Sequence, residues 1–197
     1  MKGRKRDEPV RLTRIYTRSG DGGETSLGDG TRTGKTDPLI TAIGSLDELN
    51  AAIGLALAAD TPERLRSLLE RIQNELFDLG ADLSVPPAEG SRERLRIGQE
   101  CVESLEHLCD ELNAELEPLR SFVLPGGGEA GARLHQARAI CRRAERDVLG
   151  AAREREQNPL IAVYLNRLSD LLFILARICG RVAAGGEERL WRPGASD

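Results

Sequence analysis

Aliphatic side chains repeated at the α-helical period are the feature of this sequence that most limits its fold. The clearest case runs from residue 158 to residue 185 and divides into two arcs when projected at about 100° per residue. One arc is apolar and holds Ile161, Tyr164, Leu165, Leu168, Leu171, Leu172, Leu175 and Ile178. The opposite arc is polar and holds Asn166, Ser169, Asp170, Arg177 and Arg181. This division predicts an amphipathic helix in a helical bundle.

Similar patterns predict the rest of the fold. We expect four or five helices, over residues 38–59, 61–83, 91–116, 129–155 and 158–185. Asp37 with Pro38 favours the start of the first helix, and Ser91 that of the third, which would place Leu95 in the core. Aromatic residues are only 3% of the chain, so the core must be aliphatic, which favours helices. The predicted fold class is all-α, an antiparallel helical bundle.

The totals for the chain exclude several classes of protein. A chain of 197 residues is most simply one domain, which we place at 14–185, between a disordered basic tail at 1–13 and a C-terminal tail at 186–197. The net charge of −4 gives no basic field for nucleic acid.

The four cysteines stand singly and are predicted to be reduced core thiols. We find no signal peptide and no apolar run of membrane-spanning length, and we expect a cytoplasmic protein without membrane contact.

Residues 14–37 are predicted to be loop after Tyr16, because Gly, Thr, Ser and Asp dominate. A loop of this length in a compact domain is usually functional or disordered. Its glycines allow N–H groups to converge on an anion, and its hydroxyls and Lys35 add donors. Residues 29–36 nearly spell a P-loop, but Asp29 replaces the first glycine and no helix leads directly out of the lysine. An anion-binding loop and a flexible leader stay open as alternatives.

A row of arginines accompanies the predicted helix over 129–155. Arg138, Arg142 and Arg146 follow one another at i, i+4 and i+8 beside the buried stripe. Like charges at this spacing repel by a few tenths of a kcal/mol per pair. A bound anion would offset this repulsion, so the row suits an anion-binding site, and the guanidinium fork suits polyphosphate in particular. A solvated helix face is the alternative, and the row alone does not decide between them.

Catalytic side chains are scarce. Neither His107 nor His135 has a cysteine or carboxylate at metal-ligand spacing, and we expect His135 to be a hydrogen-bonding surface residue. Phe122, followed by Pro125 and three glycines, is either a core residue or an apolar face for a ligand. A glycine-rich loop, an arginine row and the lack of a protein nucleophile suit a protein that binds a nucleoside triphosphate and leaves the attack to another group.

Seven sequence blocks resemble the PduO-type ATP:cob(I)alamin adenosyltransferases, also called corrinoid adenosyltransferases. They occur in the family's order and at compatible spacing. The blocks are IYTRSGDGGETSL (15–27), KTD (35–37), GSLDELNAAIG (44–54), IQNELFDLGADL (72–83), FVLPGG (122–127), ARAICRRAER (137–146) and YLNRLSDLLFILAR (164–177). The resemblance implies a five-helix bundle of the ferritin-like type that assembles as a homotrimer, with active sites between neighbouring subunits.

The resemblance also implies roles for matched residues. The N-terminal loop would wrap the triphosphate of ATP through Thr17, Arg18, Ser19, Gly20, Thr25, Ser26 and Lys35. The last two helices would complete the nucleotide site with Arg142, Arg143, Glu145, Arg146 and Asn166. Asp47 and Arg138 match a pair that joins subunits across the site, and with Arg142 they are the expected catalytic residues. Phe122 matches an aromatic residue that crowds the lower face of the corrin and displaces its axial base.

The implied reaction transfers the 5′-deoxyadenosyl group of ATP to cob(I)alamin, with attack of Co(I) on the ribose C5′ carbon and release of triphosphate. Mg²⁺ is expected through the ATP phosphates alone, and the corrinoid is bound as a substrate. A reductase and a cobalamin-dependent mutase are candidate partners. The chain departs from the family pattern at Arg18, at Pro38 and in the Gly-Glu-Ala-Gly stretch at 128–131.

Two other functions fit parts of the sequence. A carrier of adenosylcobalamin or a nucleotide sensor would keep Arg142 and the loop, but it would have no need of both Phe122 and Asn166. A bundle that binds nucleic acid would have no need of the glycine-rich loop. The presence of all these features favours the enzyme.

Overall fold

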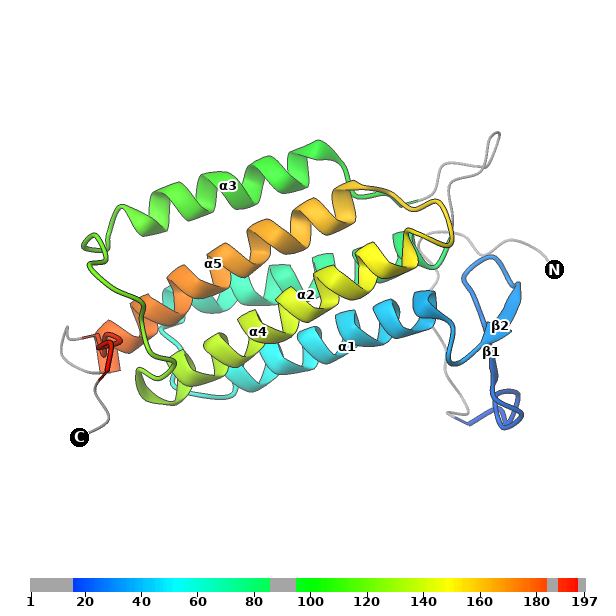
Figure 1. Ribbon diagram of the computed structural model, residues 1–197, viewed down its shortest axis with the longest axis horizontal. Coiled ribbons are helices and arrows are strands. Elements are labelled where there is room, and N and C mark those ends of the chain that lie inside the picture. The colour runs from blue at the N-terminus through cyan, green and yellow to red at the C-terminus, as the bar shows by residue number, and fades with distance from the viewer. Residues whose placement is uncertain (1–15, 86–94, 184–187, 195–197) are drawn as a thin grey trace.

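The computed structural model describes residues 16–85, 95–183 and 188–194. Its elements are the strands β1 (Glu24–Ser26) and β2 (Arg32–Gly34) and the helices α1 (Pro38–Leu57), α2 (Glu63–Leu83), α3 (Gln99–Asn113), α4 (Gly128–Ala151) and α5 (Leu160–Ala183). The described helices lie alongside one another, and the strands form a hairpin beyond the end of the bundle at which α1 begins (Figure 1). The predicted all-α bundle is confirmed, while the tail expected at 1–13 lies outside the described residues.

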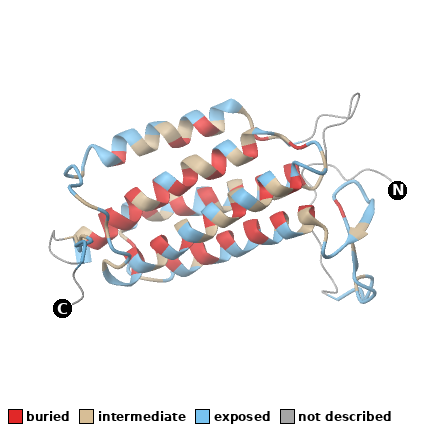
Figure 2. Ribbon diagram, in the orientation of Figure 1, coloured by how far each residue is buried: buried red, intermediate tan, exposed pale blue. Residues whose placement is uncertain are grey.

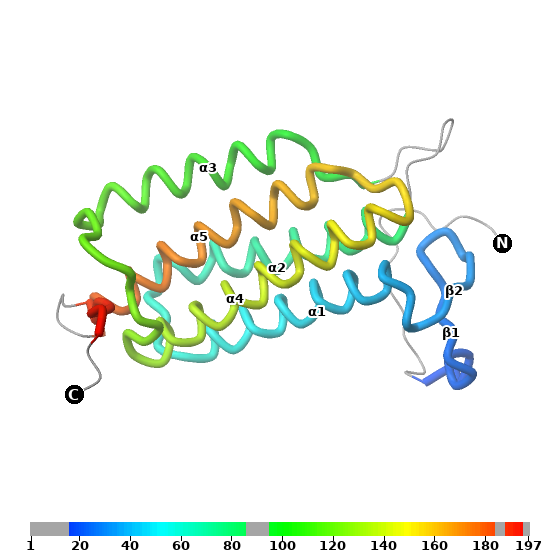
Figure 3. The backbone as a smooth tube through the Cα atoms, viewed as in Figure 1, coloured from blue at the N-terminus to red at the C-terminus, as the bar shows by residue number. Residues whose placement is uncertain are grey.

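Helix α4 lies between two neighbours with which it makes the most extensive contacts of the fold. It runs antiparallel to α1 on one side and to α5 on the other (Figures 1 and 3). Helix α2 packs beside α1, and α3 packs against α5. Because the helices alternate in direction along the chain, α3 and α5 run the same way (Figure 3).

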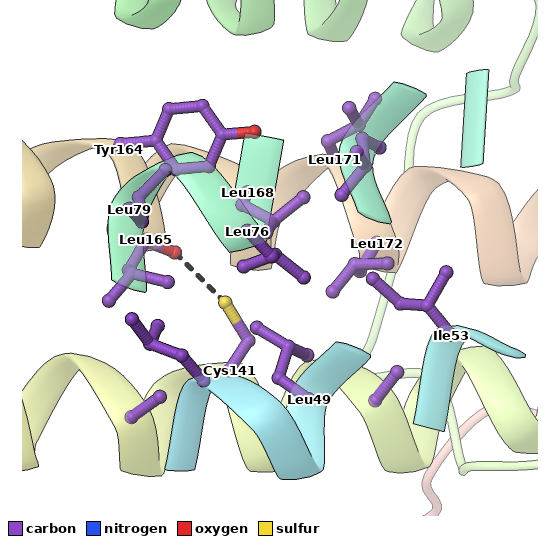
Figure 4. Packing of buried hydrophobic residues seen from close by; sticks show 14 of the residues in the cluster. Leu49, Ile53, Leu76, Leu79, Cys141, Tyr164, Leu165, Leu168, Leu171 and Leu172 are labelled. Carbon is purple, nitrogen blue, oxygen red and sulfur yellow. Dashed lines mark hydrogen bonds between the residues drawn. The ribbon is translucent and has the colours of Figure 1, made fainter. Parts of the chain in front are cut away.

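The core between the helices is aliphatic. Each helix turns its buried residues toward the others and its exposed residues toward solvent (Figure 2). Figure 4 shows Leu49 of α1, Leu76 of α2 and Leu168 of α5 meeting around Cys141 of α4, whose thiol donates to the carbonyl oxygen of Leu165 at 3.2 Å. Burying a leucine side chain in this way contributes about 1.5–3 kcal/mol, so packing is the main source of helix stability here.

Two helices start where the sequence predicts. The Oδ1 atom of Asp37 accepts a hydrogen bond from the Leu39 N–H at 2.9 Å, and Pro38 occupies the first turn of α1. At α5, Asn158 Oδ1 accepts from the Leu160 N–H at 3.1 Å. Each side chain satisfies a backbone donor that has no partner within its helix.

The third helix begins later than predicted. It starts at Gln99, and Leu95, which we expected in the core, is 44% exposed. The expected cap, Ser91, lies outside the described residues. The chain before α3 is held away from helical geometry by a buried carboxylate, since Asp82 Oδ2 accepts from the Ile97 N–H at 2.8 Å.

That carboxylate links three segments. Besides Ile97, Asp82 pairs with Arg96 and accepts from Asn158 Nδ2 at 2.8 Å. The Asp82 side chain is fully buried, so its charge depends on these donors. The network joins the end of α2, the approach to α3 and the start of α5, and it could not be read from the local sequence pattern.

The N-terminal loop contains a hairpin, so the prediction of loop throughout this segment was wrong. Strands β1 and β2 pair antiparallel with Thr25 opposite Thr33, and the Leu27 N–H donates to the Thr31 carbonyl at 2.8 Å. Gly30, at φ 89°, supplies the left-handed residue of the turn. Leu27 is 7% exposed and anchors the hairpin to the bundle. Strands of three polar residues give no alternating pattern that a sequence analysis can detect.

Helix α1 is long and apolar enough to cross a membrane by length and composition alone, contrary to the sequence-based expectation that no such run exists. Half of its apolar window is buried inside the bundle, against α4 and α2. An apolar helix covered by neighbouring helices is what the core of a folded bundle requires.

Candidate active site

The arginines of α4 divide into two groups. Arg142 is exposed and forms no ion pair with a described residue, whereas Arg143 donates to Ser45 at 3.0 Å and pairs with Glu48 and Asp147. One step along a helix rotates a side chain by about 100°, which turns Arg143 toward α1 and Arg142 away from it. Arg143 therefore joins two helices, and Arg142 is free to bind a ligand.

Arg142 borders the aromatic cavity, a hollow of about 600 Å³. Its walls come from α4, α5, the segment before α4 and the C-terminal segment, and they include Leu119, Ser121, Phe122, Val123, Arg138, Arg142, Ser169, Asp170, Phe173 and Trp191. Phe122 is 77% exposed, which decides between the two roles left open for it: the ring is not a core residue. Trp191 lies beside it, with ring centroids 6.0 Å apart and planes tilted by 57°.

The C-terminal segment holds Phe122 in place. The Trp191 N–H donates to the Phe122 carbonyl at 2.7 Å, and the Leu124 N–H donates to the Arg189 carbonyl at 2.8 Å. The Ser121 hydroxyl adds a hydrogen bond of 2.8 Å to the Trp191 carbonyl. Trp191 of this segment therefore belongs to the cavity wall, and the segment is paired with the chain around Phe122.

A buried ion pair fixes the same segment to α5. Arg177 donates to Glu188 through Nε at 2.7 Å and Nη2 at 3.0 Å, and Nη2 also donates to the Glu117 carbonyl at 2.9 Å. The periodicity places Arg177 on the polar arc of α5, but it is only 4% exposed. The chain after α5 folds back and covers it, which helical periodicity does not reveal.

Phe173 forms part of the cavity wall between two guanidinium groups. Arg138 lies 5.7 Å and Arg177 6.0 Å from its ring centroid, within the range of cation–π attraction. The Nε atom of Arg138 is buried without a hydrogen-bond partner among the described residues. Asp47, its expected partner, borders a different groove between α1 and α2, so one chain does not bring the two together.

Asn166 and Glu145 meet between α4 and α5. Asn166 Nδ2 donates to Glu145 Oε1 at 3.2 Å, and its Oδ1 accepts from Arg167 at 2.7 Å. Arg167 is itself held by Glu106 of α3 at 2.7 Å. Arg146 is exposed and donates to the Arg142 carbonyl at 2.7 Å. The predicted α4 and α5 nucleotide residues thus lie near one another on two adjacent helices.

The loop residues expected to bind triphosphate gather around a tight turn. The hydroxyls of Thr17 and Ser19 are 2.7 Å apart, and Arg18 has the left-handed φ of 61°. Lys35 passes so close to Gly20 that a Cβ at Gly20 would lie 3.0 Å from its Nζ. A side chain at Gly20 would therefore crowd the lysine and shift its position in this turn. Thr25 and Ser26 follow in β1.

The hairpin is attached to the end of α4 through Asp37. Arg155 donates to Asp37 Oδ2 at 2.7 Å, beside the Thr33 hydroxyl, which donates to the same atom at 2.6 Å. The Thr33 and Leu39 donors, with the Arg155 charge, hold the pKa of Asp37 below its usual value despite partial burial. Arg155 lies beyond the end of α4, which stops at Ala151 rather than near residue 155 as predicted.

The loop and the aromatic cavity's Phe122 segment lie at opposite ends of the bundle (Figure 1). They are separated by about 36 Å, the length of the 24-residue helix α4 at 1.5 Å per residue. Among the described residues, no contact joins Lys35 to Arg142. The two sets of predicted site residues, those of the loop and those near Phe122, therefore lie apart within one chain.

The described residues form no metal centre, and burial keeps two of their thiols protonated. No three His, Cys, Asp or Glu side chains gather there as metal ligands. Burial raises the pKa of Cys109 and of Cys179 to about 11, so both thiols stay protonated at neutral pH. The arrangement can bind an anion and an apolar surface.

Comparison with known proteins explains this combination. The cobalamin adenosyltransferase family matches residues 15–179. The chain belongs to this family. A corrinoid adenosyltransferase of Mycobacterium leprae is 50% identical over 195 residues, covering 94% of this chain and 98% of that protein. The corrinoid adenosyltransferase PduO of Salmonella typhimurium is 47% identical over 163 residues, covering 83% of this chain and 48% of that protein.

Solved structures of this adenosyltransferase family have the same fold. A Phe-to-Ala variant of a PduO-type ATP:corrinoid adenosyltransferase from Lactobacillus reuteri, in complex with cobalamin and ATP, superposes with a TM-score of 0.84 at 34% identity and covers 91% of this chain and 99% of that one. An Arg-to-Lys variant from the same organism, in complex with ATP, gives 0.82 at 35% identity, with 91% and 100% covered. The family, the fold and the adenosyltransferase class expected from the sequence are confirmed.

The sequence analysis gave no role to Trp191, Phe173 and Asp170, which line the aromatic cavity. Trp191 is the chain's single tryptophan and Phe173 one of its three phenylalanines, and this rarity was the available signal. Asp170 was placed on the polar arc of α5 without a role. His135, expected at the surface with hydrogen bonds, is instead 4% exposed, and its Nδ1 has no partner among the described residues.

Proposed function

We propose that this enzyme carries out the reaction of its family, ATP-dependent transfer of an adenosyl group to a corrinoid, in the aromatic cavity. The observation that supports this most strongly is the cavity of about 600 Å³ that places exposed aromatic rings beside Arg142, a cation without a described ion pair. An apolar wall suits a flat corrin ring, and an unpaired guanidinium suits a phosphate chain. The two substrates meet there.

The reaction forms one cobalt–carbon bond and breaks one carbon–oxygen bond. The electron pair of Co(I) attacks C5′ of the ribose, and the electrons of the C5′–O bond leave with triphosphate. The protein holds the carbon in line with the cobalt and neutralises charge on the leaving group. Arg142, Arg146 and Lys35, with Mg²⁺ bound to the phosphates, are the proposed groups. Since the substrate's cobalt is the nucleophile, protonated thiols are no obstacle.

Phe122 acts on the lower face of the corrin. Its ring is largely exposed and is fixed by the C-terminal segment, so it offers a rigid apolar surface without a donor atom. A corrin pressed against it loses its lower axial base and the water that would replace that base. Since axial donation stabilises the higher oxidation state, its removal makes Co(II) easier to reduce to Co(I).

A complete site forms between two copies of the chain. The loop with Lys35 lies at the end of the bundle opposite Phe122 (Figure 1), which supports a loop supplied by a neighbouring chain. Arg138 has a buried Nε without a described partner, and Asp47 lines a groove beside Phe77, which is 71% exposed. An ion pair between Asp47 of one chain and Arg138 of its neighbour would give the Arg138 Nε a partner and would cover the groove that Asp47 lines. We propose a cytoplasmic homotrimer, supplied by a reductase and serving a cobalamin-dependent mutase.

An anaerobic spectrum of cob(I)alamin with the protein, Mg²⁺ and ATP tests the function. We expect a light-sensitive alkylcobalamin spectrum and one triphosphate for each cobalt–carbon bond. Binding of ATP and corrinoid without such a bond would leave the carrier or sensor alternative. Sedimentation of the same sample tests the trimer independently, since a monomer at working concentration would contradict a shared site.

A further inference from the structure

A second cavity of about 240 Å³ lies next to the aromatic cavity and has no role in the reaction described above. Both cavities have Val123 in their walls. The walls of the smaller one come from the segment at 123–127, from α4, from α5 and from the C-terminal segment, and its polar side chains are those of His135, Arg177, Glu188 and Arg189. We call it the histidine cavity.

The histidine cavity contains a buried imidazole whose hydrogen bonding is incomplete. His135 is 4% exposed, and its Nδ1 has no partner among the described residues. Its ring meets Phe173 edge-on, with centroids 6.0 Å apart. Burial and the nearby Arg138 charge lower the pKa of His135, while Glu188 acts in the opposite direction, so the ring is neutral near pH 7. A neutral imidazole carries both a donor and an acceptor.

The charged groups of the histidine cavity are already paired or face solvent. Arg177 already pairs with Glu188 through Nε and Nη2 and donates to the Glu117 carbonyl, and Arg189 is exposed. A carboxylate entering the cavity would meet Glu188 without a free buried cation to balance it. A primary carboxamide carries no charge and both donates and accepts hydrogen bonds, so it matches the imidazole without a cost for burying charge.

The walls of the histidine cavity are close-packed backbone. Gly127 has φ 84°, and a Cβ there would lie 2.5 Å from Gly180 Cα. A Cβ at Gly131 would lie 2.8 Å from the Gly126 carbonyl oxygen. Backbone packed this tightly leaves little freedom to adapt, so the shape and polarity of the cavity can discriminate between groups of similar size.

We propose that the histidine cavity receives one peripheral carboxamide of the corrinoid and that His135 makes this enzyme prefer amidated corrinoids to those with a carboxylate at that position. Corrinoids bear short amide side chains around a flat ring, and a ring in the aromatic cavity directs one of them past Val123. The inference rests on the proposed placement of the corrin. It makes His135 a specificity residue.

Corrinoid binding measured by quenching of Trp191 fluorescence tests the inference without turnover. Trp191 is the single tryptophan and lies in the wall of the aromatic cavity, so a bound corrin quenches its emission. The probes are cobinamide and its monocarboxylic acids, each with one peripheral amide hydrolysed. For the wild type, we expect at least one monoacid to bind about tenfold more weakly than cobinamide, the effect of losing roughly one hydrogen bond.

Variants at the two histidines complete the test. His135→Leu should raise the Kd of cobinamide about tenfold and bring the Kd values of cobinamide and that monoacid to within about threefold of each other. His135→Gln should restore part of the cobinamide affinity and part of the preference over the monoacid. His107→Leu, at an exposed position of α3, should match the wild type. Equal affinity of the wild type for cobinamide and every monoacid overturns the inference, even if the leucine variant does not fold. So does a folded His135→Leu protein with unchanged affinities.

The two proposals fail in different ways. A wild-type protein that forms no cobalt–carbon bond contradicts the proposed function, whatever the monoacids show. A wild-type protein that adenosylates all the monoacids and cobinamide with the same KM contradicts only the assignment of the histidine cavity.

Discussion

Replacing Arg142 with alanine should abolish most of the activity and leave the stability of the bundle unchanged. The structure predicts this separation because Arg142 is exposed and pairs with no described carboxylate, while the adjacent Arg143 is tied to Ser45, Glu48 and Asp147. Arg143→Ala is therefore the matched control on the same helix. It removes the same charge and the same side chain, one position further along the helix.

The magnitudes follow from these contacts. A guanidinium that loses its hydrogen bonds to the departing triphosphate loses about 3 kcal/mol of transition-state stabilisation, or roughly 150-fold in kcat. An exposed arginine without a partner contributes no more than about 0.5 kcal/mol to folding. The Arg143 pairs are partly exposed, at 40% for its own side chain, so their loss should cost only about 1 kcal/mol and lower Tm by about 3 °C.

The assay follows the loss of cob(I)alamin absorbance under anaerobic conditions, with ATP and corrinoid varied separately. Thermal unfolding is recorded for each variant, and Arg142→Lys tests whether charge alone is sufficient. We expect the activity of the lysine variant to lie between those of the wild type and the alanine variant, because an ammonium keeps the charge but loses the two-pronged hydrogen bonding of the guanidinium. An Arg142→Ala protein within threefold of wild type in kcat/KM for both substrates would refute the assignment of the arginine.

Three further predictions concern other parts of the molecule. Phe122→Ala should depress the reaction with cobalamin more than that with a corrinoid lacking the lower base, with Tm nearly unchanged because the ring is 77% exposed; equal losses would contradict displacement of the axial base. Asp82→Ala should destabilise the protein by about 3–5 kcal/mol, since it leaves buried donors unpaired, whereas the exposed Asp60→Ala should change stability by less than about 0.5 kcal/mol in the same denaturant titration. Asp37 has a lowered pKa, so its contribution to folding stability is present above the unfolded aspartate pKa of about 4 and is lost as pH falls through the folded value. Asp37→Ala should therefore lower the free energy of unfolding by about 1 kcal/mol at pH 7 and weaken its dependence on pH between about pH 5 and 3. An unchanged acid-unfolding profile would exclude this role.

Sequence patterns predicted the elements whose causes are local. Asp37 before Pro38 fixed the start of α1, and the aliphatic stripe of α5 matched its buried residues. Where a distant group intervenes, the local pattern fails. The buried Asp82 draws Ile97 out of the third helix, and neither residue indicates this pairing from a distance of 15 positions.

The candidate site divides in the same way. The sequence could single out Arg142 and Phe122 as candidates because a helical row and an apolar residue before a glycine turn are visible in one stretch of sequence. Trp191 was missed because its place depends on backbone pairing between the segment around residue 123 and the segment around residue 190. His135 was misplaced because its neighbour Glu188 comes from that same returning segment. A single sequence contains no record of such long-range pairings.

The separation of the loop from the Phe122 end has a genetic consequence. If each site takes its loop from one copy and its aromatic wall from another, a Lys35→Ala chain and a Phe122→Ala chain are defective in different halves of the same site. Mixed oligomers of these two impaired chains would contain intact sites, and random mixing restores about a quarter of them. Alleles of this kind should complement one another, so that co-expression gives more adenosyltransferase activity than either allele alone.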